Sequence, residues 1–349
     1  AIVYAPTRAR ADEIAQHLGR SFRARAYHAG MDAGSRERVQ SELLAGQADV
    51  IVATIAFGMG IDKPNVRTVL HTASPATLEG YYQEIGRAGR DGLPALALML
   101  CSVGDRRMHD FFFDRDYPDT QELTRAYQQL SPEPMFKGTL ARKLGLDDEV
   151  MERVLEKLWT HGGAQIDFDD RVTRGHDGFL RSYPRQRAAR AALLQHMGRY
   201  LRTERCRMVA LVDHFGDHED AQHTCGQCDR CSPTQVVLQA EEVPRVSTRR
   251  TSRDRPAFAK PESRRRRRPL AQQEPDAPKK LVDALKLFRR DEAKARSIPA
   301  FHVLTDRALY AVASERPSSE AELLAIQGIG PSLAKRYGPR LLAIVRDTQ

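Results

Sequence analysis

The sequence has no apolar run of the roughly 20 residues that a membrane span needs, and it shows no secretory signal. Membrane and secreted classes are therefore disfavoured, and the cytoplasm or nucleoid is the expected location. Acidic residues are fewer than basic ones, 46 against 55, so the net charge is +9. That excess favours nucleic acid over acidic small substrates as a partner. A length of 349 residues suggests about two to four domains.

A phosphate-binding loop is also missing. No lysine is followed by serine or threonine, so the pattern G-x-x-x-x-G-K-[ST] does not occur. The Asp-Glu pairs beginning at Asp12, Asp148 and Asp291 lack the residues expected two positions further on in a Mg²⁺-holding motif. The chain begins directly in an apolar segment, without an initiator methionine. We therefore expect a fragment whose phosphate-binding half lies upstream.

The most informative segment that is present runs from Tyr81 to Gly92, YYQEIGRAGRDG. Arg87 and Arg90 are three residues apart, follow Gln83 and lie among glycines. A guanidinium group keeps its charge and offers a planar fork of donors that matches phosphate oxygens. Glycines let the backbone approach a ligand closely. An isolated R-x-x-R would be read as a solvated loop, but the segments upstream favour a phosphate site.

Those upstream segments predict an α/β domain. Five apolar segments read as strands and three amphipathic ones as helices. The expected strands are 1–5, 24–27, 50–54, 66–71 and 95–101, and the expected helices are 11–18, 36–44 and 78–85. Alternating strands and helices indicate a parallel sheet covered on both faces. Polar loops follow the strands, at the edge where open α/β sheets bind ligands.

These segments resemble motifs IV, V and VI in the second motor lobe of superfamily-two helicases, and specifically the RecQ family of DNA helicases. The likeness rests on the segment 53–64, ATIAFGMGIDKP, together with 83–92. It implies ATP-dependent unwinding of DNA with 3′-to-5′ polarity, in DNA repair and recombination, in a cytoplasmic, bacterial nucleoid-associated protein. Related RNA helicases usually differ at both segments, so an RNA helicase is disfavoured.

The resemblance also implies residue roles. Arg87 and Arg90 match the arginines that reach the γ-phosphate of ATP, with Arg90 as the finger, and Gln83 opens the same motif. The loop that couples nucleotide to DNA matches Gly58, Gly60 and Asp62. Positions lining the DNA strand or the lobe interface match Thr7, Arg8, His28 and Thr54. A structural histidine is an equal alternative for His28.

Cofactors and partners follow from the same resemblance. ATP with Mg²⁺ would bind at a site completed by the absent N-terminal motor lobe, so we expect weak or no hydrolysis from this chain alone. Single-stranded, forked or branched DNA is the expected partner, with single-strand-binding or recombination proteins as further partners. A non-enzymatic DNA-binding adaptor derived from a helicase is the alternative, because the phosphate-binding lysine is missing.

A cysteine cluster is the second strong signal. Cys225, Cys228 and Cys231 fall within seven residues, and Cys206 lies nineteen residues earlier. Four thiolates can complete a tetrahedral Zn²⁺ shell. Redox chemistry or an iron–sulfur cluster is a less favoured alternative, and His214, His218 and His223 are near enough to compete as ligands. The segment resembles the RecQ zinc subdomain, where one zinc is structural. The fifth cysteine, Cys101, is expected to be buried at a strand end.

Between the predicted α/β lobe and the cysteine cluster, helices are expected at 123–130, 136–144 and 149–161. The last two form a helix-turn-helix pattern, and 164–168 and 171–173 could be wing strands turning at Asp169-Asp170. RecQ proteins often carry a winged helix, but most place it after the zinc subdomain. A plain helical insertion is the alternative, and a helix at 186–201 is expected to lead into the zinc site.

Segment 241–280 loses apolar periodicity and reads as a disordered linker. Between Arg245 and Arg268 there are eleven basic residues against two acidic ones, and the run that includes Arg264, Arg265 and Arg266 is expected to contact DNA phosphates. Helical periodicity then returns at 281–294, 305–313, 319–325 and 333–346. With the turn at Gly328, this part resembles the HRDC module, which could contact DNA or dock protein.

The expected fold is therefore multi-domain, with an α/β RecA-like parallel-sheet lobe followed by mainly α modules. The expected domains are the second RecA-like lobe (1–117), a winged-helix-like insertion (118–185), a helical zinc-binding subdomain (186–235), a basic linker (236–277) and an HRDC helical bundle (278–349).

Overall fold

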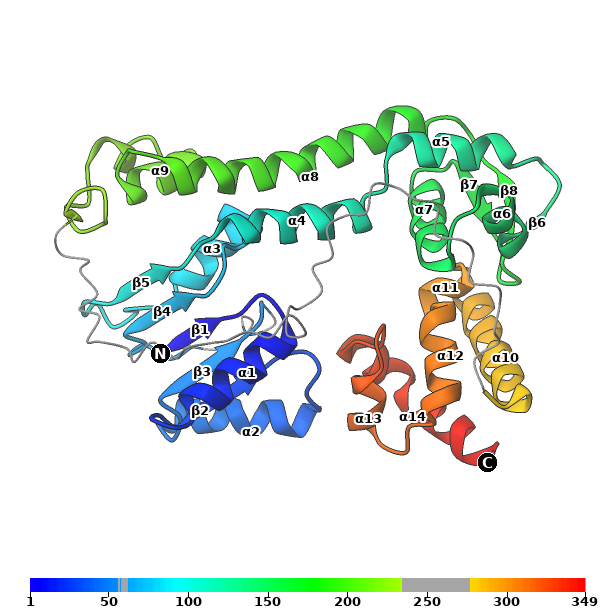
Figure 1. The fold of residues 1–349 in the computed structure, drawn as a ribbon, viewed down its shortest axis with the longest axis horizontal. Coiled ribbons are helices and arrows are strands. Elements are labelled where there is room, and N and C mark those ends of the chain that lie inside the picture. Colours follow the sequence, from blue (N-terminus) through cyan, green and yellow to red (C-terminus); the bar gives the residue numbers. More distant parts are fainter. Residues whose placement is uncertain (56, 58–61, 234–276, 349) are drawn as a thin grey trace, which may run out of the picture.

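The computed structural model describes residues 1–55, 57, 62–233 and 277–348. Within these ranges, no helix combines the length and apolar character that crossing a bilayer requires. An α/β lobe at the N-terminus is followed by a long helical arm, a small mixed module at the far end of the arm, and a C-terminal helical bundle (Figure 1).

The lobe is built on a parallel five-stranded sheet of order β2-β3-β1-β4-β5. Its strands are β1 (Ile2–Tyr4), β2 (Ala24–Tyr27), β3 (Val50–Ala53), β4 (Thr68–His71) and β5 (Leu96–Met99). The first lobe helices are α1 (Arg8–Leu18), α2 (Ala33–Leu44) and α3 (Leu78–Ile85). Small alanines of α1 pack on one face, and Val39 and Leu43 of α2 pack on the other. The expected parallel α/β fold is confirmed.

Two antiparallel helices carry the chain out of the lobe and back. The outgoing helix is α4 (Val103–Asp116), which the sequence did not predict, and the returning helix is α8 (Phe179–Arg202). The two run side by side in Figure 1, and Arg187 of α8 lies over the ring of Phe113 of α4. Helix α8 then leads through α9 (Arg207–His214) and the short 3-10 helix η1 (Asp220–Gln222) into the cysteine cluster.

A small module with a helix-turn-helix lies between these two helices. Its elements are α5 (Thr120–Gln129), β6 (Met135–Phe136), α6 (Lys137–Leu144), α7 (Asp148–Thr160), β7 (Ala164–Ile166) and β8 (Arg171–Arg174). The strands form an antiparallel sheet of order β6-β8-β7, with the turn of the wing at Asp169-Asp170. Gly145 ends α6 in the left-handed region, at φ +65°, which a glycine adopts without strain. The winged-helix-like fold follows the expected pattern.

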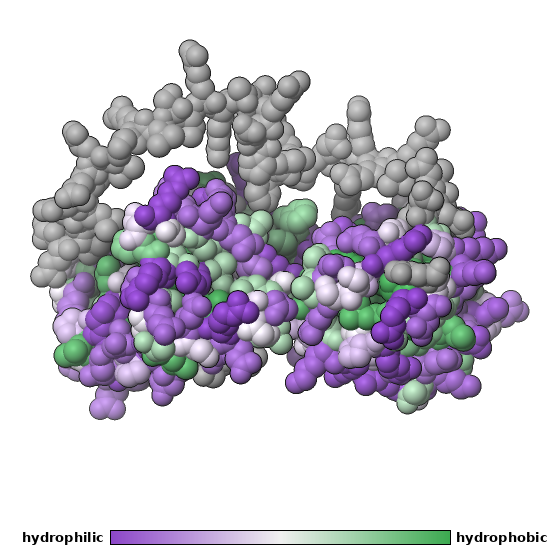
Figure 2. Space-filling view, turned by 90° about the horizontal axis from the view of Figure 1, so that it is seen from below, coloured by the Kyte–Doolittle hydropathy of each residue, from purple (hydrophilic) through white to green (hydrophobic). Residues whose placement is uncertain are grey.

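The C-terminal bundle contains α10 (Lys279–Arg296), α11 (Ala300–Val303), α12 (Asp306–Glu315), α13 (Glu320–Ala325) and α14 (Pro331–Asp347). The helices enclose one core of leucines, valines and alanines. That core continues into the winged-helix-like module, since Phe168 packs against the bundle core and Phe301 belongs to the core of the module. Seen from below, both halves of the molecule present a mostly hydrophilic surface with smaller apolar areas (Figure 2).

Candidate nucleotide-coupling and zinc sites

Three neighbouring strands bring most of the predicted DNA-lining residues to one edge of the sheet. Strands β2, β3 and β1 are adjacent and parallel, so their carboxyl ends lie together. His28 follows β2, Thr54 follows β3, and Thr7 and Arg8 begin α1 shortly after β1. Thr7 caps α1 by accepting a hydrogen bond from the Arg10 amide at 3.2 Å. Thr7 and Arg8 are exposed at this edge, whereas Thr54 is half-buried.

His28 is buried and its ring has a partner at each nitrogen. The Gly30 amide donates to Nδ1 at 3.2 Å, so Nδ1 is unprotonated and Nε2 carries the hydrogen that points at Asp12 Oδ1, 3.0 Å away. The Arg8 side chain lies directly beside Gly30. These contacts favour the structural reading of His28, with Arg8 as the side chain that faces outward at this point.

The arginine motif begins on α3 and continues into a tight turn. Arg90 Nη1 lies 2.8 Å from Asp62 Oδ1, and its Nε donates to the Gly86 carbonyl at 3.1 Å. Gly89 has φ +66°, and a Cβ there would lie 2.9 Å from the Leu93 carbonyl oxygen. Only glycine therefore fits the turn between the two arginines. Asp62 and Gln83 are exposed; Gly58 and Gly60 lie outside the described residues.

Arg87 is connected to the strand edge through Tyr4. The buried Tyr4 hydroxyl donates to the Phe57 carbonyl at 3.1 Å, and the Arg87 guanidinium lies close enough to the same hydroxyl for its charge to act on it. Burial raises the pKa of Tyr4 to about 12, although the nearby Arg87 charge opposes this shift. Phe57 follows Thr54 closely, so the turn after β3 and the arginine motif share one tyrosine. No sequence pattern pointed to Tyr4, which reads as an apolar strand residue.

Stacked rings connect the same tyrosine to the helical arm. Tyr4 stacks on His71 at 5.0 Å between ring centroids, His71 contacts Tyr81 at 5.3 Å, and Tyr81 contacts Tyr200 of α8 at 5.6 Å. His71 is also held by Glu84 of α3, at 2.7 Å and fully buried. Helix α3, which carries Gln83 and delivers both arginines, is therefore packed directly on the arm that leads to the cysteines.

The four predicted cysteines converge. The sulfurs of Cys206, Cys225, Cys228 and Cys231 all lie within 4.8 Å of one another. Adjacent pairs are separated by 3.5 Å (Cys206 to Cys225), 3.9 Å (Cys206 to Cys228) and 3.5 Å (Cys228 to Cys231). Four sulfurs at zinc-bond length in a tetrahedron are roughly 3.8 Å apart, so the donor set fits one zinc ion. Within the described ranges, these four cysteines are the group of metal-ligating side chains that lie close enough together to hold an ion.

Backbone amides favour the thiolate state that a metal needs. The Cys225 amide donates to Cys206 Sγ, and the Arg207 amide donates to Cys228 Sγ, both at 3.3 Å. Burial raises the pKa of the Cys206 thiol, but backbone amides together with the Cys225 and Cys231 thiols outweigh burial and lower it to about 6. Burial and the same neighbouring thiols raise the pKa of Cys231 to about 12. The Arg207 side chain holds Asp229, between two of the cysteines, with two bonds of 2.9 Å, and lies over the ring of Tyr200.

Two of the three competing histidines, His214 and His218, have other partners. His214 Nε2 lies 2.8 Å from Glu79 of α3, and His218 Nδ1 lies 3.2 Å from Asp213. The expectation for Cys101 was wrong, because its side chain is exposed after the edge strand β5. Arg264, Arg265 and Arg266 lie outside the described residues.

Three family models match this sequence. Residues 1–92 match the helicase conserved C-terminal domain, residues 170–232 match RecQ zinc-binding, and residues 279–345 match the HRDC domain. The parallel lobe with its arginine turn thus defines the C-terminal motor domain of a helicase.

Similar curated proteins indicate the same family as the three family models. An ATP-dependent DNA helicase RecQ from Synechocystis is 34% identical over 66% of this chain and 48% of its own length. The RecQ of Haemophilus influenzae is 28% identical over 99% of this chain and 59% of its length. The chain thus spans about half to three-fifths of these relatives. It belongs to the RecQ family of DNA helicases and matches its C-terminal portion, with zinc-binding and HRDC modules.

Proposed function

We propose that this chain provides the second motor lobe and the accessory modules of an ATP-dependent, 3′-to-5′ DNA helicase that acts in DNA repair and recombination. The observation that carries the proposal is the placement of Arg90 against Asp62, with Arg87 joined through Tyr4 to the turn after β3. Arginine charge beside the loop that couples nucleotide to DNA suits a sensor of the γ-phosphate.

In the proposed mechanism, ATP and Mg²⁺ are held by a motor lobe that carries the phosphate-binding loop, and this chain contributes arginines. Arg90 exchanges its contact with Asp62 for the γ-phosphate oxygens, where its charge stabilises the transferring group. Arg87, through Tyr4, moves together with the turn that holds Thr54. Gln83, Gly58 and Gly60 belong to the same coupling region by family resemblance.

The exposed or half-buried residues at the carboxyl edge are proposed to follow one DNA strand. Arg8 would contact phosphate, and Thr7 and Thr54 would offer hydroxyl donors. His28 would act indirectly, because its ring holds Asp12 and Gly30 beside Arg8. The zinc ion would be structural, and the basic segment with Arg264, Arg265 and Arg266 would add salt-sensitive affinity for DNA. The domain boundaries stay a prediction, and the predicted boundary at 185/186 falls inside the continuous helix α8 (Phe179–Arg202).

The test uses a protein in which this chain is joined to a RecQ lobe that carries the phosphate-binding loop. Arg90→Ala is expected to reduce DNA-stimulated ATP hydrolysis by about 10³-fold or more, the effect of losing an arginine finger. DNA binding should be nearly unchanged. The matched control is Arg106→Ala, which removes an exposed arginine of α4. Equal turnover in the two variants would refute the finger assignment.

The missing phosphate-binding motif favours a second candidate for these 349 residues taken alone, a DNA-binding adaptor without catalysis. Measuring hydrolysis and DNA binding by the chain in one buffer separates the two candidates. Binding without hydrolysis fits both, so the joined protein decides. If joining the phosphate-binding lobe produces no ATP hydrolysis or unwinding, the adaptor is supported.

A further inference from the structure

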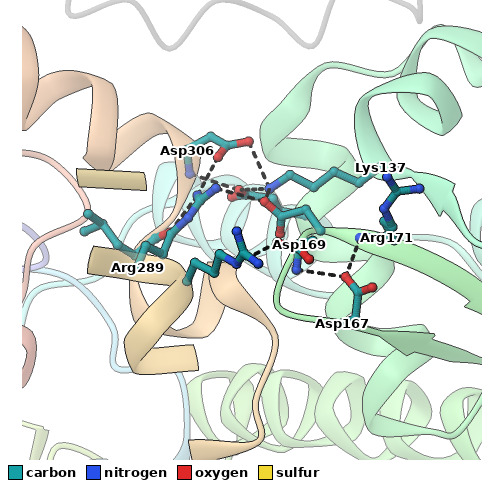
Figure 3. Close-up of polar contacts among 10 residues, drawn as sticks. Lys137, Asp167, Asp169, Arg171, Arg289 and Asp306 are labelled. Atoms are coloured by element: carbon teal, nitrogen blue, oxygen red, sulfur yellow. Dashed lines mark hydrogen bonds and ion pairs between the residues drawn. The ribbon is translucent and has the colours of Figure 1, made fainter. Parts of the chain in front are cut away.

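A buried ionic cluster joins the winged-helix-like module to the HRDC bundle (Figure 3). Its five members come from five different places in the chain: the start of α6, the middle of α7, the wing turn, α10 and the start of α12. They are Lys137, Glu152, Asp170, Arg289 and Asp306. The first four are each less than 9% exposed. Charges this deeply buried are costly unless they are paired, so the arrangement requires the two modules to meet.

The pairing crosses between the modules. Arg289 of the bundle lies 2.8 Å from Asp170 of the wing turn and 2.6 Å from Asp306. Lys137 of the module lies 2.9 Å from Asp306 of the bundle, and the Asp306 amide donates to Glu152 at 3.1 Å. Each module therefore supplies both a cation and a carboxylate. If the modules separate, Arg289 and Asp306 stay paired within the bundle, but Asp170 loses Arg289 and Lys137 loses Asp306. The module is then left with two buried carboxylates for one lysine.

The electrostatics favour the charged state of Lys137, Arg289 and Asp306, whereas burial raises the pKa of Asp170 and of Glu152 above their ordinary values in spite of the nearby cations. Burial lowers the pKa of Lys137, but the surrounding carboxylates raise it by more, and the pKa of Arg289 is raised by the same balance. Burial also raises the pKa of Asp306, but Lys137 and Arg289 outweigh burial and leave that pKa below its ordinary value. The central contact between the modules is thus an ion pair network.

The wing turn is preshaped for this contact. The Asp167 carboxylate accepts from the amides of Asp169 and Arg171 at 2.8 and 2.9 Å. Asp170 takes φ +58°, in the left-handed region that few side chains other than Asn and Asp tolerate. This backbone aims the Asp170 carboxylate at Arg289, while Arg290 of α10 holds Asp169 at 3.0 Å.

The bundle contacts the part of the module that would otherwise read DNA, although Asp148 and Glu149 at the start of α7 stay exposed. In a helix-turn-helix, the N-terminal residues of the second helix contact base edges. Here α7 begins with Asp148 and Glu149, and Glu149 is paired with Arg307 of the bundle at 2.9 Å. An acidic helix start repels phosphates, and its partner here is Arg307 of α12, whereas Arg289 and Arg290 of α10 meet the wing turn. Apolar contacts complete the seam, since Phe301 enters the core of the module.

We propose that the winged-helix-like module is a docking platform for the HRDC bundle of the same chain, and not a reader of duplex DNA. The N-terminus of α7 and the wing turn are its docking surface, and the Arg289 face of the bundle is its partner. This inference does not depend on the motor function proposed above.

The test measures amide hydrogen exchange in residues 149–152 and 168–171 of the full chain. Arg289→Glu places a third carboxylate beside Asp170 and Asp306, so exchange in both segments should accelerate at least about tenfold. The matched control is Arg346→Glu, the same charge change at an exposed end of α14. Equal exchange in the two variants would overturn the proposal.

Two further arms keep the test decisive. If Arg289→Glu also exposes α14, the bundle has unfolded, and Asp170→Asn is used instead, because asparagine keeps the left-handed backbone and removes the charge from the platform. Asp170→Asn should accelerate exchange at 149–152 while α14 stays protected. In the unmodified chain, protection of 149–152 should persist on dilution and should not increase when duplex DNA is added. Loss on dilution would indicate a second copy, and added protection would indicate DNA; either result contradicts the proposal.

Discussion

The two accessory modules are attached by interfaces of opposite chemistry. The zinc-bearing arm meets the motor lobe through aromatic and apolar side chains, with Tyr81 and Leu78 of α3 against Tyr200, Met197 and Leu211. The HRDC bundle meets the winged-helix-like module through buried charges. Burial of apolar surface stabilises with little demand on geometry. Buried ion pairs contribute little net stability but penalise every arrangement that leaves a charge unpaired.

The chemistry of each interface fits its position in the molecule. Helix α3 carries Gln83 and leads to Arg87 and Arg90, so the aromatic contact holds the arginine turn and the zinc arm as one body. The ionic seam lies far from that turn, at the other end of the α4 and α8 arm (Figure 1). It specifies which two surfaces meet. Substitutions that separate these two roles should therefore have effects of different size.

The largest effect is expected from the zinc ion. Structural zinc typically contributes about 10–16 kcal/mol of apparent binding energy to folding, so Cys228→Ser should unfold the segment from α9 to Cys231. Circular dichroism and elemental analysis check this, with Cys101→Ser as the matched control, since Cys101 is exposed and outside the cluster. One zinc per chain is expected in the unmodified protein; finding iron instead, or no metal, would contradict the assignment.

The aromatic interface should come next. Tyr200→Ala removes a buried ring between the lobe and the arm and should lower the free energy of unfolding by about 3 kcal/mol or more. Tyr200→Phe keeps the ring and should cost much less. Thermal unfolding followed by near-ultraviolet circular dichroism measures both, with Phe22→Ala at an exposed site as the control. Equal losses in Tyr200→Ala and Phe22→Ala would show that the stack does not hold the arm.

The smallest effect is expected at the rim of the ionic seam. Arg307 and Glu149 are both about half exposed, so water screens their attraction, and Arg307→Ala should cost no more than about 1 kcal/mol. Hydrogen exchange at 149–152 should then change only slightly, in contrast to Arg289→Glu. A loss as large as that of Arg289→Glu would mean that the rim, and not the buried centre, holds the bundle.

Local sequence patterns predicted much of this structure. Apolar segments placed all five strands of the lobe, and helical periodicity placed α10, α12, α13 and α14 of the HRDC bundle, each to within a few residues. The four-residue helix α11 was not predicted. Cysteine spacing identified Cys206, Cys225, Cys228 and Cys231 as one group, and the four sulfurs do converge. The order of the arginine motif identified Arg87 and Arg90, whose catalytic roles stay a prediction.

Other features needed the tertiary structure, because they depend on residues far apart in the chain. Tyr4 joins Arg87 to Phe57 only once β1 is packed beside β3. Cys101 was expected to be buried, but β5 is the edge strand and leaves it exposed.

By itself, the sequence determined the local elements, the cysteine group and the arginine turn, since neighbours in the chain decide these. The tertiary structure alone decided that Arg289 and Lys137 would meet Asp170, Glu152 and Asp306. Each of these charges looks like a solvated surface residue in its own helix or turn. Which of them is buried depends on how the two modules pack against each other, and no local sequence pattern predicts that packing.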